Sequence, residues 1–178
     1  MPNLNTIPNW VTLSRLLSIP IIFMVLSNND STMTRQIATI AFLIAALTDW
    51  LDGYLARTLN QVSEFGKFLD PLVDKLLVIA ALLILLELEQ IPAWAVFVII
   101  AREILITAWR GAPDASTPTI IGANIWGKVK TVSQILAIAA LLLEIPYALA
   151  LFWLAVILTI VSGLIYVLPL STQDVSSG

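Results

Sequence analysis

The sequence of 178 residues contains no cysteine and no histidine. Disulfide bonds, thiolate nucleophiles, histidine bases and zinc sites built from these side chains are therefore excluded. Charged residues make up only 12% of the chain, and a net charge of −3 argues against a nucleic-acid partner, which normally requires a basic surface. What remains is strongly apolar, with 59% hydrophobic residues and a mean hydropathy of +0.94. This composition predicts a polytopic integral membrane protein, because a soluble domain of this length would expose too much apolar surface.

Polar segments and prolines divide the chain into six apolar runs, several of them near the ~20 residues that cross a bilayer. The expected fold class is all-α, with six transmembrane helices forming a single membrane domain over residues 1–170 and a polar tail over 171–178. Polar connections are expected at 27–34, 60–67, 87–90 and 111–126. The expected spans are residues 9–26, 35–59, 68–88, 93–109, 127–143 and 147–170.

The basic residues predict how the helices are oriented. When the six helices alternate in direction, nearly every lysine and arginine falls at one end. Only Arg35 falls at the other end, together with Glu87, Glu89 and Glu144. The positive-inside rule then places both termini and the basic end in the cytoplasm, in a bacterial-type plasma (inner) membrane.

One stretch, residues 48–75, concentrates four aspartates inside apolar sequence. Asp49 and Asp52 are three residues apart, and Asp70 and Asp74 are four apart, so each pair shares one face of a helix. Two such helices would bring four carboxylates together where an unpaired charge is costly. Hard oxygen ligands of this kind are neutralised by Mg²⁺ or Mn²⁺. The stretch therefore predicts a metal site facing the cytoplasm.

Eight residues at fixed spacings within this stretch resemble, at every position, the signature of the CDP-alcohol phosphotransferase family. They are Asp49, Asp52, Gly53, Ala56, Arg57, Gly66, Asp70 and Asp74. The resemblance implies an enzyme that displaces CMP from a CDP-linked donor, using the hydroxyl of an acceptor alcohol and two divalent cations, Mg²⁺ or Mn²⁺. It also implies a homodimer surrounded by membrane lipid. The alternative interpretation is that these are ordinary helix-end aspartates that pair with nearby cations.

The resemblance assigns a role to each of these eight residues. It implies that all four aspartates are metal ligands and that Asp74 is also the general base. A carboxylate has to serve as the base, because the chain has no histidine. The small residues Gly53, Ala56 and Gly66 would let the cytidine nucleotide lie close to the backbone, while Arg57 would face its phosphates.

A second group lies in the first apolar run, where Asn9, Thr12 and Arg15 are spaced by three. Arg15 lies more than one turn inside that run, so a functional role is the default interpretation. The family resemblance extends to this group and implies that Thr12 and Arg15 line the donor pocket. The alternative is that Arg15 only extends its charged end to the membrane surface.

A third group predicts the acceptor. Arg102 and Glu103 lie midway along the fourth run, Arg110 ends it, and the segment that opens the fifth contains Lys128 and Lys130. Cations beside the metal site suit an acceptor that carries a phosphate, and Arg102, Arg110 and Lys128 are assigned to it. The alternative for Lys128 and Lys130 is that they are plain cytoplasmic anchors. With the segments IPNWVTLSR and KTVSQ, these residues resemble the branch of the family whose acceptor is sn-glycerol 3-phosphate. Residues 111–126 depart from that branch, since they contain two prolines and lack both lysine and arginine.

The implied reaction transfers the phosphatidyl group of CDP-diacylglycerol to glycerol 3-phosphate, giving phosphatidylglycerophosphate and CMP. Three alternatives keep the donor and change the acceptor to phosphatidylglycerol (as in a cardiolipin synthase), inositol phosphate or serine. A membrane cation transporter would also place acids in a membrane, but it would not require the pattern of Gly53, Ala56 and Arg57. A soluble prenyl diphosphate synthase is excluded by the near-spanning apolar runs.

Overall fold

The computed structural model describes residues 7–28, 31–58, 64–110 and 121–171, and within these ranges every regular element is an α-helix. The predicted all-α class is therefore confirmed for the described part of the chain. The helices are α1 (Ile7–Asn28), α2 (Thr32–Thr58), α3 (Glu64–Glu87), α4 (Ala93–Arg110), α5 (Ile121–Leu142) and α6 (Ala148–Ser171).

Two predicted connections are longer than the structure allows. The loop expected over 111–126 is wrong in its second part, because α5 begins at Ile121 and includes 121–126. The turn expected over 60–67 is wrong from Glu64 onward, because these residues form the first turn of α3. A glutamate in the first turn is favourable beside the positive end of the helix dipole. The expected tail loses one residue, since Ser171 still belongs to α6.

The start of α2 is fixed by a reciprocal pair of side-chain caps. The backbone N–H of Thr34 donates to the Ser31 hydroxyl at 3.2 Å, and the backbone N–H of Ser31 donates to the Thr34 hydroxyl at 2.8 Å. Each hydroxyl thus satisfies an N–H that the first helical turn leaves without a partner. This arrangement begins α2 at Thr32, earlier than the residue 35 expected from hydropathy.

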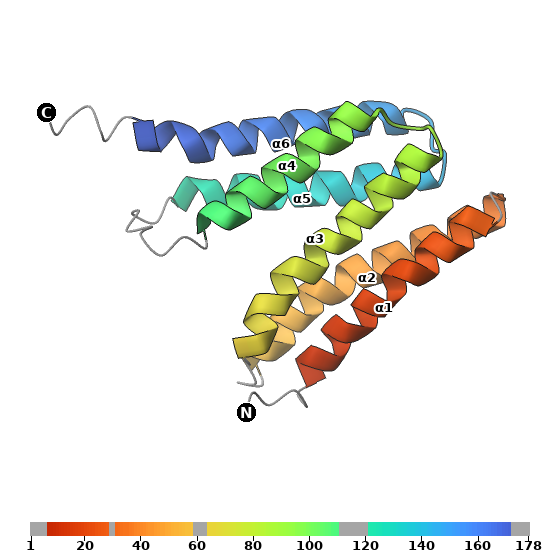
Figure 1. Ribbon diagram of the computed structural model, residues 1–178, viewed down its shortest axis with the longest axis horizontal. Coiled ribbons are helices and arrows are strands. Elements are labelled where there is room, and N and C mark those ends of the chain that lie inside the picture. Colours follow the sequence, from red (N-terminus) through yellow and green to blue (C-terminus); the bar gives the residue numbers. More distant parts are fainter. Residues whose placement is uncertain (1–6, 29–30, 59–63, 111–120, 172–178) are drawn as a thin grey trace, which may run out of the picture.

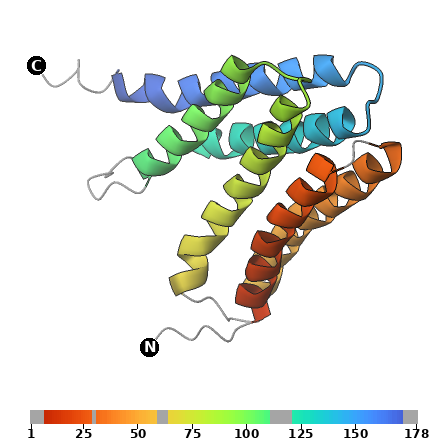
Figure 2. The same cartoon turned by 45° about the vertical axis from the view of Figure 1, so that its right-hand side comes forward.

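The helices form two groups that are joined through α3 (Figures 1 and 2). In one group α1 packs against α2 and α3, and in the other α6 packs against α4 and α5. The ends of α1, α3 and α5 lie together with the starts of α2, α4 and α6. The opposite end of the bundle therefore holds the end of α2, the start of α3, the end of α4 and the start of α5. The aspartate motif and the predicted acceptor segments both belong to this second end, which we call the motif end.

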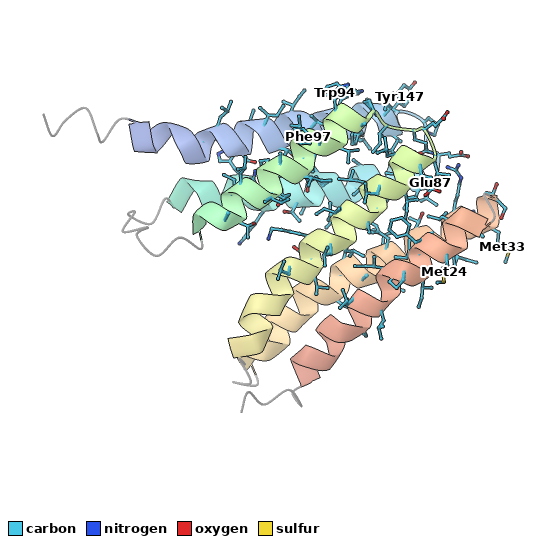
Figure 3. The ribbon with its side chains drawn as sticks, in the orientation of Figure 1. Met24, Met33, Glu87, Trp94, Phe97 and Tyr147 are labelled. Atoms are coloured by element: carbon cyan, nitrogen blue, oxygen red, sulfur yellow. The ribbon has the colours of Figure 1, made fainter. Side chains whose placement is uncertain are left out.

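Side chains from all six helices meet in one apolar core. Fully buried examples include Phe42 of α2, Leu85 of α3, Ile99 of α4 and Phe152 of α6. Large apolar side chains also cover the outside of the helices. Met24, Met33, Trp94, Phe97 and Tyr147 are all more than half exposed and point away from the bundle (Figure 3). Soluble proteins rarely expose apolar surface on this scale.

Two helical segments in the described part of the chain are long and apolar enough to cross a membrane. They are Ile125–Leu142 in α5 and Ala148–Ile165 in α6, with mean hydropathies of 1.4 and 2.6. The two helices pack against each other along most of their lengths, and α6 also packs against α4 (Figure 1).

A polar cluster ties the helices together at the end opposite the motif end. Arg35 forms an ion pair with Glu144, with 3.0 Å between Nη1 and Oε1. With the oxygen and nitrogen of its amide exchanged, Gln90 accepts a hydrogen bond from Nη1 of Arg35 through its oxygen. Its nitrogen then donates to the Leu141 carbonyl at 3.1 Å. The cluster joins the start of α2, the turn after α3 and the end of α5. The prediction that Arg35 and Glu144 lie at the same end is thus confirmed.

Candidate functional site

The backbone brings the predicted site residues to the motif end of the bundle. The helices α2 and α3 carry the whole aspartate motif, α1 carries the predicted donor residues, and Arg110 ends α4. Most of these side chains lie outside the described part of the structure, so their predicted roles stay predictions. They are Thr12, Arg15, Asp49, Asp52, Gly53, Ala56, Arg57, Gly66, Asp70 and Arg110.

Asp74 is the one motif aspartate whose side chain is described, and it lines a small cavity of about 20 Å³. The cavity lies where α3, α4 and α5 meet. Two further ionisable groups come from the neighbouring helices, Glu103 from α4 and Lys130 from α5. The remaining lining residues are Lys75, Val78, Ile79, Ile99, Thr131 and Gln134. Acidic, basic and hydroxyl groups thus converge in a space that is otherwise walled by apolar side chains.

Three charged side chains beside this cavity form one buried network. The Lys130 ammonium donates to Oε1 of Glu103, and Nη1 of Arg102 donates to the same oxygen at 3.2 Å. Their side chains are only 5%, 12% and 12% exposed for Lys130, Glu103 and Arg102. Burial of charges is unfavourable unless they are paired, and one carboxylate here pairs with two cations. Of the three groups, Glu103 and Lys130 line the cavity, and Arg102 contacts it through the Glu103 carboxylate.

The position of Lys130 is set by the way α5 packs on α6. Gln134 lies one turn further along α5 and donates through Nε2 to the Thr159 hydroxyl of α6 at 2.9 Å. Thr159 in turn donates to the Ala155 carbonyl at 2.7 Å. Both Gln134 and Thr159 are buried. Since residues four apart share a helix face, this contact turns Lys130 inward as well.

The predicted acceptor residues have different outcomes. Arg102 lies in the buried network as described, whereas Lys128 is exposed and is not part of the cavity lining. The sequence places Glu103 and Lys130 beside these cations, but the prediction assigned the acceptor phosphate to Lys128 and not to Lys130. The signal that could have singled out Lys130 is its helical spacing from Gln134 and Ile138, which places it on the buried face of α5. Lys128 lies two residues away and so points to another side of the helix.

The predicted metal site is only partly covered by the structure. Among the side chains that are described, no three acids gather in a way that could hold an ion. Asp74 is the only one of the four predicted ligands within that set, so this finding does not test the metal prediction. The Asp74 carboxylate is a hard oxygen donor of the kind that Mg²⁺ and Mn²⁺ prefer.

Residues 5–161 match the CDP-alcohol phosphatidyltransferase family. The chain belongs to this family, which confirms the resemblance found in the aspartate motif. Relatives carry a more specific name. A Bacillus subtilis protein named CDP-diacylglycerol–glycerol-3-phosphate 3-phosphatidyltransferase is 45% identical over 88% of this chain and 91% of its own length. Proteins of the same name from Haemophilus influenzae and Salmonella typhimurium are 40% and 39% identical, each over 90% of this chain and 90% and 92% of their own lengths.

Proposed function

We propose that this protein transfers the phosphatidyl group of CDP-diacylglycerol to sn-glycerol 3-phosphate, which gives phosphatidylglycerophosphate and CMP. The observation that carries the proposal is the 45% identity to a relative of that name, over 88% of this chain and 91% of the relative. The buried cations beside Asp74 support it independently, because an acceptor with a phosphate requires positive charge close to the reacting hydroxyl.

The reaction needs one proton acceptor, and Asp74 is the residue we assign to it. The acceptor hydroxyl attacks the phosphorus that carries the diacylglycerol, and the bond from this phosphorus to the bridging oxygen of CMP breaks. The hydroxyl proton passes to the Asp74 carboxylate, and CMP leaves with the electron pair. Asp74 lines the same cavity as Lys130, so a hydroxyl beside Asp74 and a phosphate beside Lys130 can belong to one small molecule.

We assign Asp49, Asp52, Asp70 and Asp74 as the ligands of two divalent cations, Mg²⁺ or Mn²⁺. When bound, such ions neutralise the pyrophosphate and stabilise the leaving phosphate. The donor is assigned to neighbouring positions on the same helices. Gly53, Ala56 and Gly66 give the nucleotide close access to the backbone, and Thr12, Arg15 and Arg57 face its phosphates.

For the acceptor phosphate, the structure favours a different set of cations from the one predicted. Arg102 and Lys130 flank the carboxylate of Glu103 within the buried part of the site. A charge-assisted contact is strongest where water is excluded, so we assign the phosphate to these two residues. Lys128 is exposed and Arg110 ends α4. We place both at the mouth of the site, where they attract the acceptor.

We further propose that all six helices cross the membrane as one domain over residues 1–171, with a polar tail from 172 and with homodimers as the assembled form. The motif end and both termini face the cytoplasm, in a plasma (inner) membrane of bacterial type. The exposed apolar side chains and the two segments of spanning length support this placement. So does Arg35, the lone basic residue of the opposite end, which is paired with Glu144.

A panel of acceptors tests the choice of substrate. Purified protein with CDP-diacylglycerol and Mg²⁺ would be supplied in turn with glycerol 3-phosphate, phosphatidylglycerol, inositol phosphate and serine, and CMP release would be measured. We expect the fastest release with glycerol 3-phosphate. With serine, which carries no phosphate, release should be slower by about 100-fold, because buried cations left without a phosphate are costly. Fastest release with phosphatidylglycerol would instead identify a cardiolipin synthase, and our assignment of the acceptor would be wrong.

The close approach of the nucleotide can be tested at Ala56. Replacing it by leucine adds three carbons where the cytidine is proposed to lie, and we expect at least a tenfold loss of donor affinity, equal to about 1.4 kcal/mol. Binding of CDP-diacylglycerol can be measured directly by calorimetry in detergent. Ala150→Leu, at an exposed position near the start of α6 and at the end opposite the motif end, serves as the control. Unchanged donor binding in Ala56→Leu would show that this face of α2 does not contact the nucleotide.

A further inference from the structure

Helix α6 carries no charged residue, but it lies directly against a charged one. A methyl group added at Gly163 would lie 3.3 Å from Cγ of Arg102 and 3.9 Å from its Nε. Within the described part of the chain, no other atom outside the local helix backbone comes within 4 Å of that position. The missing side chain of Gly163 therefore gives room to one residue, the arginine of the buried network.

That arginine is held at both ends of its side chain. Its Cγ lies beside Gly163, and its Nη1 donates to Glu103, whose carboxylate also receives the Lys130 ammonium. The side chain of Arg102 is only 12% exposed, so it has little freedom to move away from an obstruction. A displacement of Arg102 would also shift the oxygen of Glu103 that both cations share.

We propose that Gly163 is a positioning residue for the acceptor phosphate, which it affects through Arg102. By leaving the surface of α6 open, it lets the stem of Arg102 pass along that helix and places the guanidinium beside Glu103 and the cavity. Gly163 does not touch the substrate in this account. The inference rests on the proposed function, because the readout is the affinity for an acceptor phosphate.

Glycine at position 163 lowers the stability of helix α6, and the contact with Arg102 explains why it is nevertheless present. Within a helix, glycine is among the least favourable residues because it loses the most backbone entropy on folding. Gly127 of α5 provides the contrast, because a methyl group there would meet no atom within 4 Å. Gly127 and Gly163 thus form a matched pair, of which only Gly163 lies against the network.

The first experiment compares Gly163→Ala and Gly163→Val with Gly127→Ala. Acceptor titrations at saturating CDP-diacylglycerol should show a kcat/KM for glycerol 3-phosphate that falls about three- to tenfold in Gly163→Ala and further in Gly163→Val, since small displacements of a binding group are costly. The KM for the donor should stay near the wild-type value in all three, and Gly127→Ala should match the wild type. Unchanged acceptor kinetics in Gly163→Val would overturn the proposal.

The second experiment repeats Gly163→Ala in an Arg102→Ala background, where the stem that the methyl group meets is gone. If Gly163 acts through Arg102, the substitution should then change acceptor kcat/KM by less than about twofold, the usual error of additivity. An effect as large as in the wild-type background would mean that Gly163 serves only general packing, and the proposal would fail.

Thermal unfolding of Gly163→Ala and Gly127→Ala, each made in the wild type and in the Arg102→Ala background, separates this proposal from the proposed function. Gly163→Ala should raise Tm more in the Arg102→Ala background than in the wild type, whereas Gly127→Ala should have the same effect in both. If the wild type released no CMP with glycerol 3-phosphate, the proposed function would be wrong, and the Tm comparison would still decide on Gly163. Equal shifts in both backgrounds would refute the contact with Arg102.

Discussion

Replacing Asp74 by asparagine is expected to lower kcat by about 10²–10⁴-fold, the range that a general base contributes. The amide keeps the size of the side chain but can no longer take the proton of the acceptor hydroxyl. Single-turnover CMP release at saturating donor and acceptor measures this step directly. The helical content and Tm of the variant should stay close to the wild-type values, because Asp74 is only half-buried beside the cavity.

Glu144→Gln is the matched control for this substitution. It also converts a carboxylate to an amide, but it lies at the end opposite the motif end, where Glu144 is 62% exposed and paired with Arg35. We expect its kcat to stay within about twofold of the wild type, since the pair with Arg35 lies at the end of the bundle opposite the proposed site. If Asp74→Asn turned over as fast as Glu144→Gln, then Asp74 would not be the base.

The second large effect is expected at Lys130. Lys130→Met should reduce the affinity for glycerol 3-phosphate by about ten- to a hundredfold, which corresponds to the roughly 1.5–3 kcal/mol of a charge-assisted contact. It should also lower the free energy of unfolding by up to about 3 kcal/mol, because Glu103 loses one of its two partners inside the protein. Acceptor titration and thermal unfolding of the same preparation measure the two losses separately.

A double substitution distinguishes the two roles of Lys130. In Lys130→Met combined with Glu103→Gln, the buried carboxylate is neutral, so much of the lost stability should return. The acceptor affinity should remain low, because the cation is still missing. Recovery of both properties together would show that Lys130 only balances the charge of Glu103 and does not bind the phosphate.

Lys128→Gln provides a comparison on the same helix. Because Lys128 is exposed, its charge is screened by water and salt. We expect a loss of acceptor affinity no greater than about threefold, and a smaller one at high ionic strength. A larger loss in Lys128→Gln than in Lys130→Met would place the phosphate at the mouth of the site, as the sequence alone suggested.

The aspartate motif shows why much of this protein could be predicted from its sequence. Metal and nucleotide chemistry requires certain residues at fixed spacings on two helices, and both the family match and the helical backbone over 48–58 and 64–75 agree with that prediction. The alternation of apolar runs and polar breaks similarly predicted the six helices within the described ranges. These features are local, so a single sequence contains them.

The features that the sequence did not reveal depend on contacts between distant residues. Lys128 and Lys130 look alike as neighbouring cations, and only the packing of Gln134 against Thr159 decides which of them turns inward. The space at Gly163 is likewise visible only once α4 is placed against α6. Helix ends were missed for a different reason. Hydropathy does not register the hydroxyl caps of Ser31 and Thr34 that begin α2.

In the proposed reaction, CMP release is coupled to the transfer of the phosphatidyl group onto glycerol 3-phosphate. The most direct measurement supplies purified protein with CDP-diacylglycerol, Mg²⁺ and labelled glycerol 3-phosphate, and quantifies CMP and labelled lipid in the same samples. We expect the two products to form in equal amounts, both to cease in excess chelator, and both to return when Mg²⁺ or Mn²⁺ is restored. CMP release without labelled lipid, or full transfer in excess chelator, would contradict this account.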